Sequence, residues 1–215
     1  MAMSDITIIG SGHMARAIGF RMIHARKSVQ IVGRNTIKTE ELVEDLGAGA
    51  TAAAPGDALE GRIVILAISH DAAKKVVSDY SSQLAGKVVV HISNTVDPAS
   101  FDRLTVPSGT SGAEEVADLL PDDVPVVKAF NTCFAGPLEK GAVGSVPLDV
   151  FIAGDSEEAK ARLSAVVAAS GLRPIDSGPL RRARELEAFM LVVMGLQVNP
   201  EHPRFNWDTA LKILP

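Results

Sequence analysis

Short apolar runs rich in valine and isoleucine alternate along the chain with stretches in which apolar residues recur at helical spacing. A strand buried on both faces of a parallel sheet has a continuous apolar sequence, and such strands are joined by crossover helices. The apolar runs predict strands at residues 6–9, 29–32, 62–68, 87–92, 124–130, 148–153 and 172–175. The pattern therefore indicates an α/β protein.

Amphipathic stretches lie between these strands and predict helices at residues 13–25, 38–46, 71–83, 112–120, 157–169 and 179–196. The alternation of strand and helix with short connections is typical of a Rossmann-type, doubly wound parallel sheet. We expect this domain to occupy residues 1–142 and a small C-terminal α/β extension to occupy residues 143–215.

Two segments have weaker patterns. Residues 51–61 have room for a short strand and one helical turn, and the pattern leaves them undecided. Residues 199–215 begin with two prolines close together and end in a short amphipathic stretch. This tail predicts a linker followed by a docked helix.

The last long helix is apolar on nearly all sides between residues 188 and 196. This run of nine residues is about half of what a membrane-spanning helix needs, so no membrane partner is expected. A helix of this kind must bury more than one side. Both burial within the chain and a homodimer interface satisfy that requirement.

A glycine-rich turn, IIGSGHMARAIG at residues 8–19, follows the first predicted strand. Gly10, Gly12 and Ala15 form a GxGxxA pattern at the point where an apolar strand ends and a helix begins. The first glycine permits the tight turn, the second lets the backbone approach a pyrophosphate, and the small third residue lets the helix pack on the strand. The N–H groups of residues 11–14 would face that anion.

The second strand ends in Gly33, Arg34 and Asn35, where an NAD-binding unit would place an Asp or Glu for the ribose 2′-hydroxyl. A carboxylate repels a 2′-phosphate, whereas a guanidinium can bind one through two hydrogen bonds. The predicted cofactor is therefore NADP(H). Lys38 is a weaker candidate for the same phosphate, and a solvated helix position is the alternative role for it.

Composition excludes several other classes of function. The formal net charge is −5 and no basic run is present, so a nucleic-acid partner is not expected. The single cysteine, Cys133, excludes an intramolecular disulfide and the common zinc patterns, so we expect no metal site and a packing role for Cys133. No signal peptide precedes the first strand, which favours a cytoplasmic location.

Neutral polar residues follow the later predicted strands, where a nicotinamide ring would lie. The candidates for contact with nicotinamide are Ser69, His70, Asn131 and Thr132, accompanied by Ser93, Asn94 and Thr95. His70 is the one residue among them with useful proton chemistry, and a capping or surface role is its alternative. No catalytic residue is identified from the sequence.

Four segments resemble one known family: GSGHMARAIG at residues 10–19, VGRN at 32–35, VVKAFNT at 126–132 and GLRPIDSGPLRRARELE at 171–187. They are similar to the F420-dependent NADP oxidoreductases, also called NADPH-dependent F420 reductases, and to the NADPH-binding reductase domain of the STEAP metalloreductases. The resemblance covers nearly the whole chain. The segment at 171–187 is its most specific element.

The resemblance implies hydride transfer between NADP(H) and a small-molecule redox partner, either the deazaflavin coenzyme F420 or a flavin such as FMN or FAD. It also implies a homodimer, with the acceptor site and dimer contacts in the C-terminal extension. The expected cofactor-binding residues are Gly10, Ser11, Gly12, His13, Met14, Gly33, Arg34, Asn35, Ile68, Ser69, Ser93, Asn94, Ala129 and Asn131.

The sequence departs from the archaeal members at three places. Asn131-Thr132 replaces a His-Thr pair close to the deazaflavin, Ser69-His70 and Ser93-Asn94 replace proline-rich strand ends, and NPEHPRFNW is an insertion. The acceptor therefore stays open between deazaflavin and flavin.

Alternative functions are an NADPH:flavin or ferric reductase and a non-enzymatic NADPH-sensing protein. A pyrroline-5-carboxylate reductase begins with a similar turn but continues into a larger helical region. A β-hydroxyacid dehydrogenase needs a catalytic lysine in a long helical second domain. Neither region has a counterpart in this sequence.

Overall fold

One eight-stranded sheet organises the computed structural model, which describes residues 4–214. Its strands are β1 Ile6–Ile9, β2 Val29–Val32, β3 Ala50–Ala53, β4 Ile63–Leu66, β5 Val88–His91, β6 Val126–Lys128, β9 Asp149–Gly154 and β10 Arg173–Asp176. Their spatial order is β10-β9-β6-β5-β4-β1-β2-β3. From β3 to β6 the strands are mutually parallel in the order of a dinucleotide-binding Rossmann fold, which confirms the predicted doubly wound sheet.

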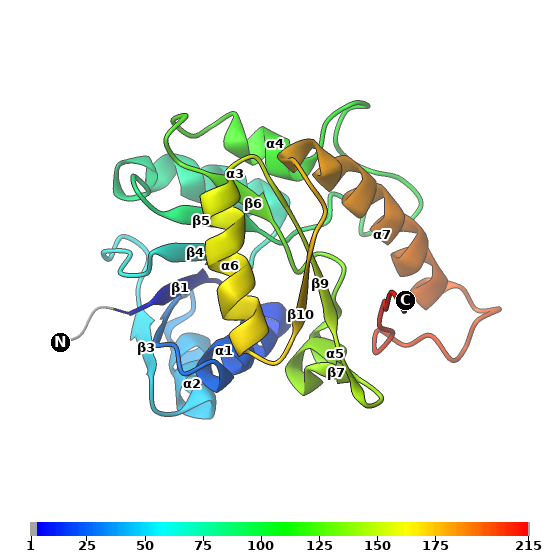
Figure 1. Ribbon diagram of the computed structural model, residues 1–215, viewed down its shortest axis with the longest axis horizontal. Coiled ribbons are helices and arrows are strands. Elements are labelled where there is room, and N and C mark those ends of the chain that lie inside the picture. Colours follow the sequence, from blue (N-terminus) through cyan, green and yellow to red (C-terminus); the bar gives the residue numbers. More distant parts are fainter. Residues whose placement is uncertain (1–3, 215) are drawn as a thin grey trace.

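Helices cover both faces of the sheet, as Figure 1 shows. The helices are α1 His13–His24, α2 Thr36–Leu46, α3 His70–Asp79, α4 Gly112–Ala117, α5 Ala135–Lys140, α6 Glu157–Ala169 and α7 Ala183–Val198. One apolar cluster joins the sheet to α1, α2, α5 and α6, and a second joins the opposite face to α3 and α4. Helix α7 extends away from the edge of these layers (Figure 1).

Successive residues of each central strand enter opposite halves of the core. In β4, Ile63 and Ile65 belong to the cluster beneath α1, whereas Val64 and Leu66 belong to the cluster beneath α3. All four residues are buried. Because both faces of the sheet are covered, the strand is apolar at every position and lacks the alternation of a half-exposed strand.

The C-terminal residues continue the same sheet. Strand β9 runs antiparallel to β6, and β10 runs parallel to β9. A short hairpin of β7 Ala142–Val143 and β8 Val146–Pro147 precedes them. Helix α7 is fixed to β6 by a buried ion pair in which Lys128 Nζ lies 2.7 Å from Glu187 Oε1.

The predicted strands and long helices are present, with shifts of a few residues at their ends. The undecided stretch at residues 51–61 holds the end of β3 and then an irregular turn. Helix α5 and the β7–β8 hairpin were not expected, because each is only a few residues long and carries too few apolar positions to show a period.

The helix predicted near the C-terminus is wrong, because residues 199–214 form no regular structure. Their backbone groups are used in tertiary contacts instead. Trp207 N donates to Gln197 Oε1 at 3.1 Å, and Ile213 N donates to an Asp149 carboxylate oxygen at 2.8 Å. A helix would have used these N–H groups for its own hydrogen bonds.

Asp149 at the start of β9 ties the C-terminal elements together. Its side chain is fully buried, and it accepts hydrogen bonds from Arg173 Nε and Nη2, both at 2.7 Å, and from Lys212 Nζ at 2.5 Å. Burial opposes ionisation of this carboxyl. The hydrogen bonds from Arg173, Lys212 and the Ile213 N–H outweigh that effect and lower the pKa of Asp149.

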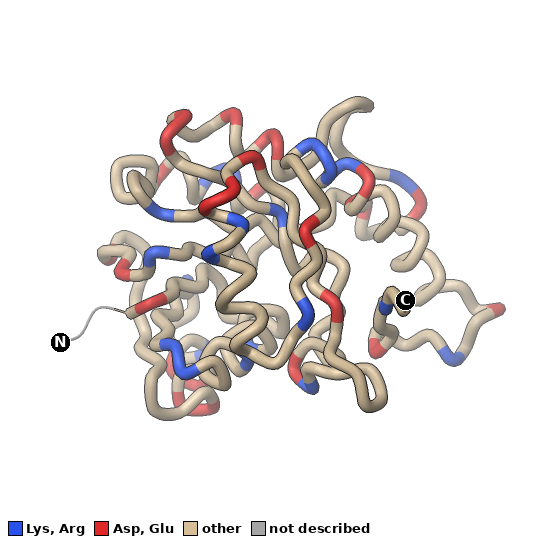
Figure 2. The backbone as a smooth tube through the Cα atoms, viewed as in Figure 1, with Lys and Arg blue, Asp and Glu red and all other residues tan. Residues whose placement is uncertain are grey.

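Acidic and basic residues are interspersed along the whole chain, as Figure 2 shows. Within the described residues, no helix combines the length and the apolar character that crossing a membrane requires.

Replacing Asp149 with Asn should lower the free energy of unfolding by about 2–4 kcal/mol at neutral pH, because it leaves the basic partners without a buried counter-charge. The folded-state pKa of Asp149 is lowered, so this stabilisation is present above its ordinary value of 3.8 and is lost as the pH falls through the folded-state pKa. Urea denaturation at a series of pH values measures both effects.

The control is Asp122→Asn, which changes an exposed carboxylate and should alter stability by less than about 0.5 kcal/mol. A difference between wild type and Asp149→Asn that stays constant as the pH falls below 3.8 would contradict the assignment.

Candidate functional site

The turn after β1 packs its backbone directly against the end of β4. Gly10 has a φ of +120°, and a Cβ at this position would lie 2.3 Å from the carbonyl oxygen of Ala67. Gly12 is the N-cap of α1, and a Cβ there would meet nothing within 4 Å. Glycine at position 10 therefore permits close packing, whereas glycine at position 12 leaves open space at the helix N-terminus.

The N-terminus of α1 is suited to an anion. The N-cap makes no side-chain hydrogen bond to the helix, and the first turn contains no acidic residue. The first-turn N–H groups and the positive end of the helix dipole thus face the open space in front of Gly12.

The residues after β2 combine a structural cap with an exposed cation. A Cβ on Gly33 would lie 2.0 Å from Thr39 Oγ1, so glycine allows α2 to approach the strand closely. The side chain of Asn35 accepts a hydrogen bond from Lys38 N at 3.1 Å and caps α2. Arg34 lies between them and is exposed.

Two adjoining cavities follow the carboxyl ends of the strands. We call the first, of about 1010 Å³, the β2-side cavity; it is lined by residues that follow β1, β2 and β4 and by α3. The second, the β6-side cavity, has about 960 Å³ and is lined by residues that follow β4, β5 and β6. Both include Gly12, Ala67, Ile68 and Ser69, so the two cavities meet at the glycine turn.

The β2-side cavity contains Arg34 and Asn35 together with Tyr80 from the end of α3. The hydroxyl of Tyr80 accepts a hydrogen bond from Gly56 N at 2.6 Å. This contact holds the loop after β3 beside the cavity, so a ligand there would lie between the loop, the helix and the guanidinium.

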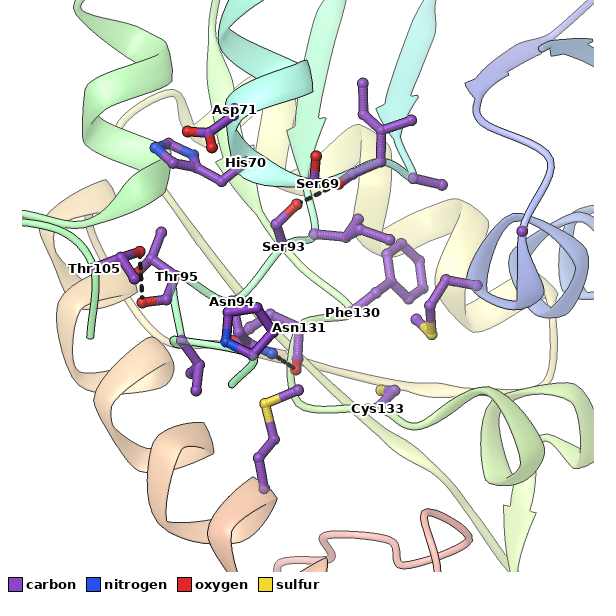
Figure 3. Close-up of a pocket in the computed structure, with 18 of the residues that line it drawn as sticks. Ser69, His70, Asp71, Ser93, Asn94, Thr95, Thr105, Phe130, Asn131 and Cys133 are labelled. Carbon is purple, nitrogen blue, oxygen red and sulfur yellow. Dashed lines mark hydrogen bonds between the residues drawn. The ribbon is translucent and has the colours of Figure 1, made fainter. Parts of the chain in front are cut away.

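The floor of the β6-side cavity is a pair of asparagines, drawn in Figure 3. Asn94 Nδ2 donates to the Asn131 carbonyl oxygen at 2.8 Å, and Asn131 Nδ2 donates to Asn94 Oδ1 at 3.0 Å. Phe130, just before Asn131, has a φ of +59°, a left-handed conformation that costs a bulky residue roughly 1–2 kcal/mol. Among residues 4–214, the buried atoms Asn131 Oδ1 and Thr132 Oγ1 have no hydrogen-bond partner.

Residues from the C-terminal part contribute an apolar wall to the β6-side cavity. Met194 of α7 and Trp207 of the irregular tail both line it. The Trp207 ring makes edge contacts with Phe134 and Phe101, at centroid distances of 5.5 Å and 5.4 Å. The cavity wall is therefore aromatic and apolar where the floor is polar.

His70 and Cys133 also line this cavity, and their surroundings differ. His70 Nε2 lies 2.9 Å from Glu115 Oε2, and its Nδ1 lies 3.4 Å from His91 Nε2. Burial raises the pKa of the Cys133 thiol to about 12, so a thiolate is scarce at neutral pH. This agrees with the packing role expected for Cys133.

The structure brings most of the sequence-predicted residues to the two cavities. Those that line the β2-side cavity are Gly10, Ser11, Gly12, Arg34, Asn35, Ile68 and Ser69. Those that line the β6-side cavity are Gly12, His13, Met14, Ile68, Ser69, His70, Ser93, Asn94, Thr95 and Asn131. Ala129 and Thr132 are buried beside the asparagine floor, and Gly33 is buried against Thr39.

Several lining residues were not predicted: Tyr80, Gly56, Lys74, Thr105, Glu115, Phe130, Phe134, Met194 and Trp207. Tyr80 follows the end of α3 and Glu115 lies on α4, and at neither position does the sequence indicate a cavity. Trp207 lies in the tail for which a helix was expected. These residues reach the site only through the packing of distant segments.

The arrangement fits an elongated dinucleotide that spans both cavities. The open space at Gly12 admits a phosphate at a helix N-terminus, Arg34 lines the β2-side cavity, and Asn131, whose buried Oδ1 has no partner, lines the β6-side cavity. An amide group on a ligand would supply the donor that this oxygen lacks.

Residues 5–95 match the model of a family described as NADP oxidoreductase, coenzyme F420-dependent. The chain is 35% identical over 191 residues to metalloreductase STEAP3 of Rattus norvegicus and 32% identical over 146 residues to the F420-dependent NADP reductase of Methanocaldococcus jannaschii. It also resembles the crystal structure of a hypothetical protein from Sinorhizobium meliloti, with a TM-score of 0.74 and 30% identity over 83% of this chain and 86% of that one.

The matches cover different parts of the relatives. The alignment with STEAP3 includes 86% of this chain but 36% of the metalloreductase. The alignment with the archaeal reductase includes 66% of this chain and 64% of that protein. The chain thus spans less than two thirds of each curated relative named here.

Proposed function

We propose that the chain is a member of the coenzyme F420-dependent NADP oxidoreductases, whose family model residues 5–95 match, and that it transfers a hydride between NADP(H) and a deazaflavin or flavin acceptor. The observation that carries the proposal is the pair of cavities that meet at the glycine turn. One holds the arginine for a 2′-phosphate, and the other has a polar floor and an aromatic wall.

In this proposal the β2-side cavity takes the adenosine half of NADP(H). Arg34 binds the 2′-phosphate, and its planar guanidinium also suits the face of the adenine ring. The N–H groups at the start of α1 hold the pyrophosphate in the space that Gly12 leaves open.

The β6-side cavity then takes the nicotinamide half. The Asn94–Asn131 pair orients the carboxamide, with Asn131 Oδ1 as the acceptor for its N–H group. Bound NADPH supplies a hydride from its nicotinamide ring. The chain contributes by holding two ring systems at reacting distance and by excluding water, so few catalytic side chains are needed.

The acceptor ring lies, in this proposal, between the nicotinamide position and the wall made by Met194 and Trp207. An apolar wall beside a polar floor suits a planar ring that carries heteroatoms along one edge. Both a deazaflavin and a flavin meet this description. STEAP3 is named a metalloreductase and the archaeal relative an F420-dependent reductase, which is why both acceptors are kept.

Arg34→Ala should weaken NADPH binding by roughly 1.5–3 kcal/mol, or about 10- to 150-fold in Kd, and leave NADH binding nearly unchanged. The reason is the loss of a charge-assisted contact to the 2′-phosphate, which NADH lacks. Calorimetric titration with each dinucleotide measures the difference. Lys38→Ala is the matched control, because it removes another exposed cation near the start of α2.

If Arg34→Ala weakened NADPH and NADH binding equally, the assignment of Arg34 to the 2′-phosphate would be wrong. A loss confined to Lys38→Ala would transfer the role to that lysine.

NADPH oxidation should be observed with at least one of F420, FMN, FAD and riboflavin, followed by nicotinamide absorbance. Trp207 is the chain's single tryptophan and lines the proposed acceptor cavity, so the same acceptor should quench the protein's fluorescence when NADP⁺ is bound. AMP, which has no tricyclic ring, is the control ligand.

Binding without oxidation of NADPH by any acceptor would favour the NADPH-sensing alternative. Oxidation by pyrroline-5-carboxylate alone would favour that reductase class instead.

We also propose that the protein is a homodimer formed through the outer face of α7. This face exposes Phe189 by 51% and Val192 by 60%, which are three residues apart and therefore lie on one side of the helix. Exposed apolar side chains of this size gain free energy when a second copy covers them.

The double variant Phe189→Glu/Val192→Glu should sediment as a monomer at micromolar concentration, because charges do not fit a buried apolar interface. Ile37→Glu on α2 is the control, since Ile37 is also exposed, by 68%, but lies on another face. A wild-type protein that sediments only as a monomer would reject the interface.

A further inference from the structure

A row of titratable side chains runs from the buried centre of the sheet to the β6-side cavity. It begins at Lys128 of β6, continues through His91 of β5 and His70 of α3, and ends at Glu115 of α4. Lys128 and His91 have no exposure to solvent, whereas His70 and Glu115 line the cavity. The hydride step described above makes no use of this row.

The contacts of Lys128 define its protonation state. Its Nζ lies 2.7 Å from Glu187 Oε1, 2.5 Å from the Ser93 carbonyl oxygen and 3.1 Å from His91 Nδ1. An ammonium group has three N–H donors, and these are three acceptors. Burial lowers the pKa of Lys128, and the Glu187 carboxylate opposes this shift. The side chain is thus a protonated group that releases its proton more readily than an exposed lysine.

This ammonium group also fixes the tautomers of the two histidines. Because His91 Nδ1 accepts from Lys128, the neutral ring carries its hydrogen on Nε2, which lies 3.4 Å from His70 Nδ1. His70 then carries its hydrogen on Nε2, which donates to Glu115 Oε2 at 2.9 Å. Burial, followed by the charge of Lys128, lowers the pKa of His91 well below its usual value and keeps that ring neutral.

Every hydrogen in the row therefore points from Lys128 toward Glu115. The charged groups that face the row are few. Glu187 of α7 lies behind Lys128, and Lys74 of α3 lies 3.0 Å from Glu115 Oε2. The hydrogen bond from His70, with the contacts of Lys74, lowers the pKa of Glu115 and keeps it ionised at the cavity.

We propose that Lys128, His91, His70 and Glu115 form a proton store that supplies, at the β6-side cavity, the proton that accompanies hydride transfer to the acceptor. The inference rests on the proposed function, because a flavin-type ring that gains a hydride also gains one proton on a ring nitrogen. If Lys128 served only to form a structural ion pair with Glu187, the two histidines that connect it to the cavity would have no role.

The proton balance is as follows. Lys128 gives a proton to His91 Nδ1, His91 gives its Nε2 proton to His70 Nδ1, and His70 gives its Nε2 proton to Glu115. Glu115 passes that proton to the acceptor, so one N–H bond breaks at Lys128 and one forms on the acceptor ring. A solvent proton then returns through Glu115 and the same bonds in reverse, which restores the ammonium group.

In this scheme Glu115 is the catalytic residue that touches the acceptor, and His91 is a positioning and relay residue. Neutral imidazole is too weak an acid to give up a proton alone. It can do so only when its other nitrogen gains one, which is why the ammonium group at the buried end is required.

The first test needs no acceptor. Nitrogen-15 NMR of the histidine rings in the wild-type protein should show the ring hydrogen of both His91 and His70 on Nε2. A ring protonated on Nδ1 at either position would overturn the proposal, since the row of hydrogens would be broken.

The second test uses the acceptor found active above, in single-turnover reduction by NADPH. His91→Gln keeps an acceptor and a donor but does not relay a proton, and Glu115→Gln removes the terminal group. Each should slow acceptor reduction by about 100-fold, the lower end of the range that general acid catalysis supplies, with NADPH affinity unchanged. Glu114→Gln is the matched control, because Glu114 is the neighbouring glutamate on α4 and contacts Arg184 instead.

The pH profile separates a relay from a structural role. The wild-type rate should fall as the pH rises far enough for Lys128 to lose its proton. The His91→Gln rate should lack this fall at high pH. Equal rates and equal profiles for wild type and His91→Gln would overturn the proposal. If none of the acceptors is reduced, the proposed function is wrong. The NMR measurement of the histidine tautomers needs no acceptor, so it still tests the arrangement of hydrogens in the row.

Discussion

A lysine ammonium group with no exposure to solvent holds helix α7 against the central sheet. Lys128 belongs to the central sheet, and its partner Glu187 belongs to α7, which carries the wall of the β6-side cavity. Burying a charge is costly, and removing one partner of such a pair is worse because it leaves the other unpaired. The ion pair therefore holds α7 against the sheet, and α7 carries part of the cavity wall.

The parallel sheet supplies the rest of the site. Its strands end at one edge, so polar residues that follow β4, β5 and β6 meet there although they are far apart in the chain. The close packing of Gly10 on Ala67 brings the glycine turn against the end of β4, where the two cavities meet. The proposed hydride transfer depends on how the two rings are placed, and a floor of neutral amides suits that requirement.

The residues of the proposed NADP(H) site were predictable because each follows the end of a strand closely. Gly10, Gly12 and Arg34 act at fixed distances from strand ends, and those ends are visible as apolar runs. The acceptor half was predictable only in outline. The asparagines of its floor were identified, but Trp207 and Glu115 lie on segments whose position depends on long-range contacts.

The sequence by itself determined the strand and helix order, the doubly wound sheet and the glycine turn, since periodicity and glycine sterics are local properties. Tertiary structure alone decided that the tail is irregular, because Asp149 and Gln197 take up its backbone N–H groups. It also decided that His91 and His70 lie in one row that ends at the cavity. Such contacts join residues that are distant in sequence, so no local sequence pattern predicts them.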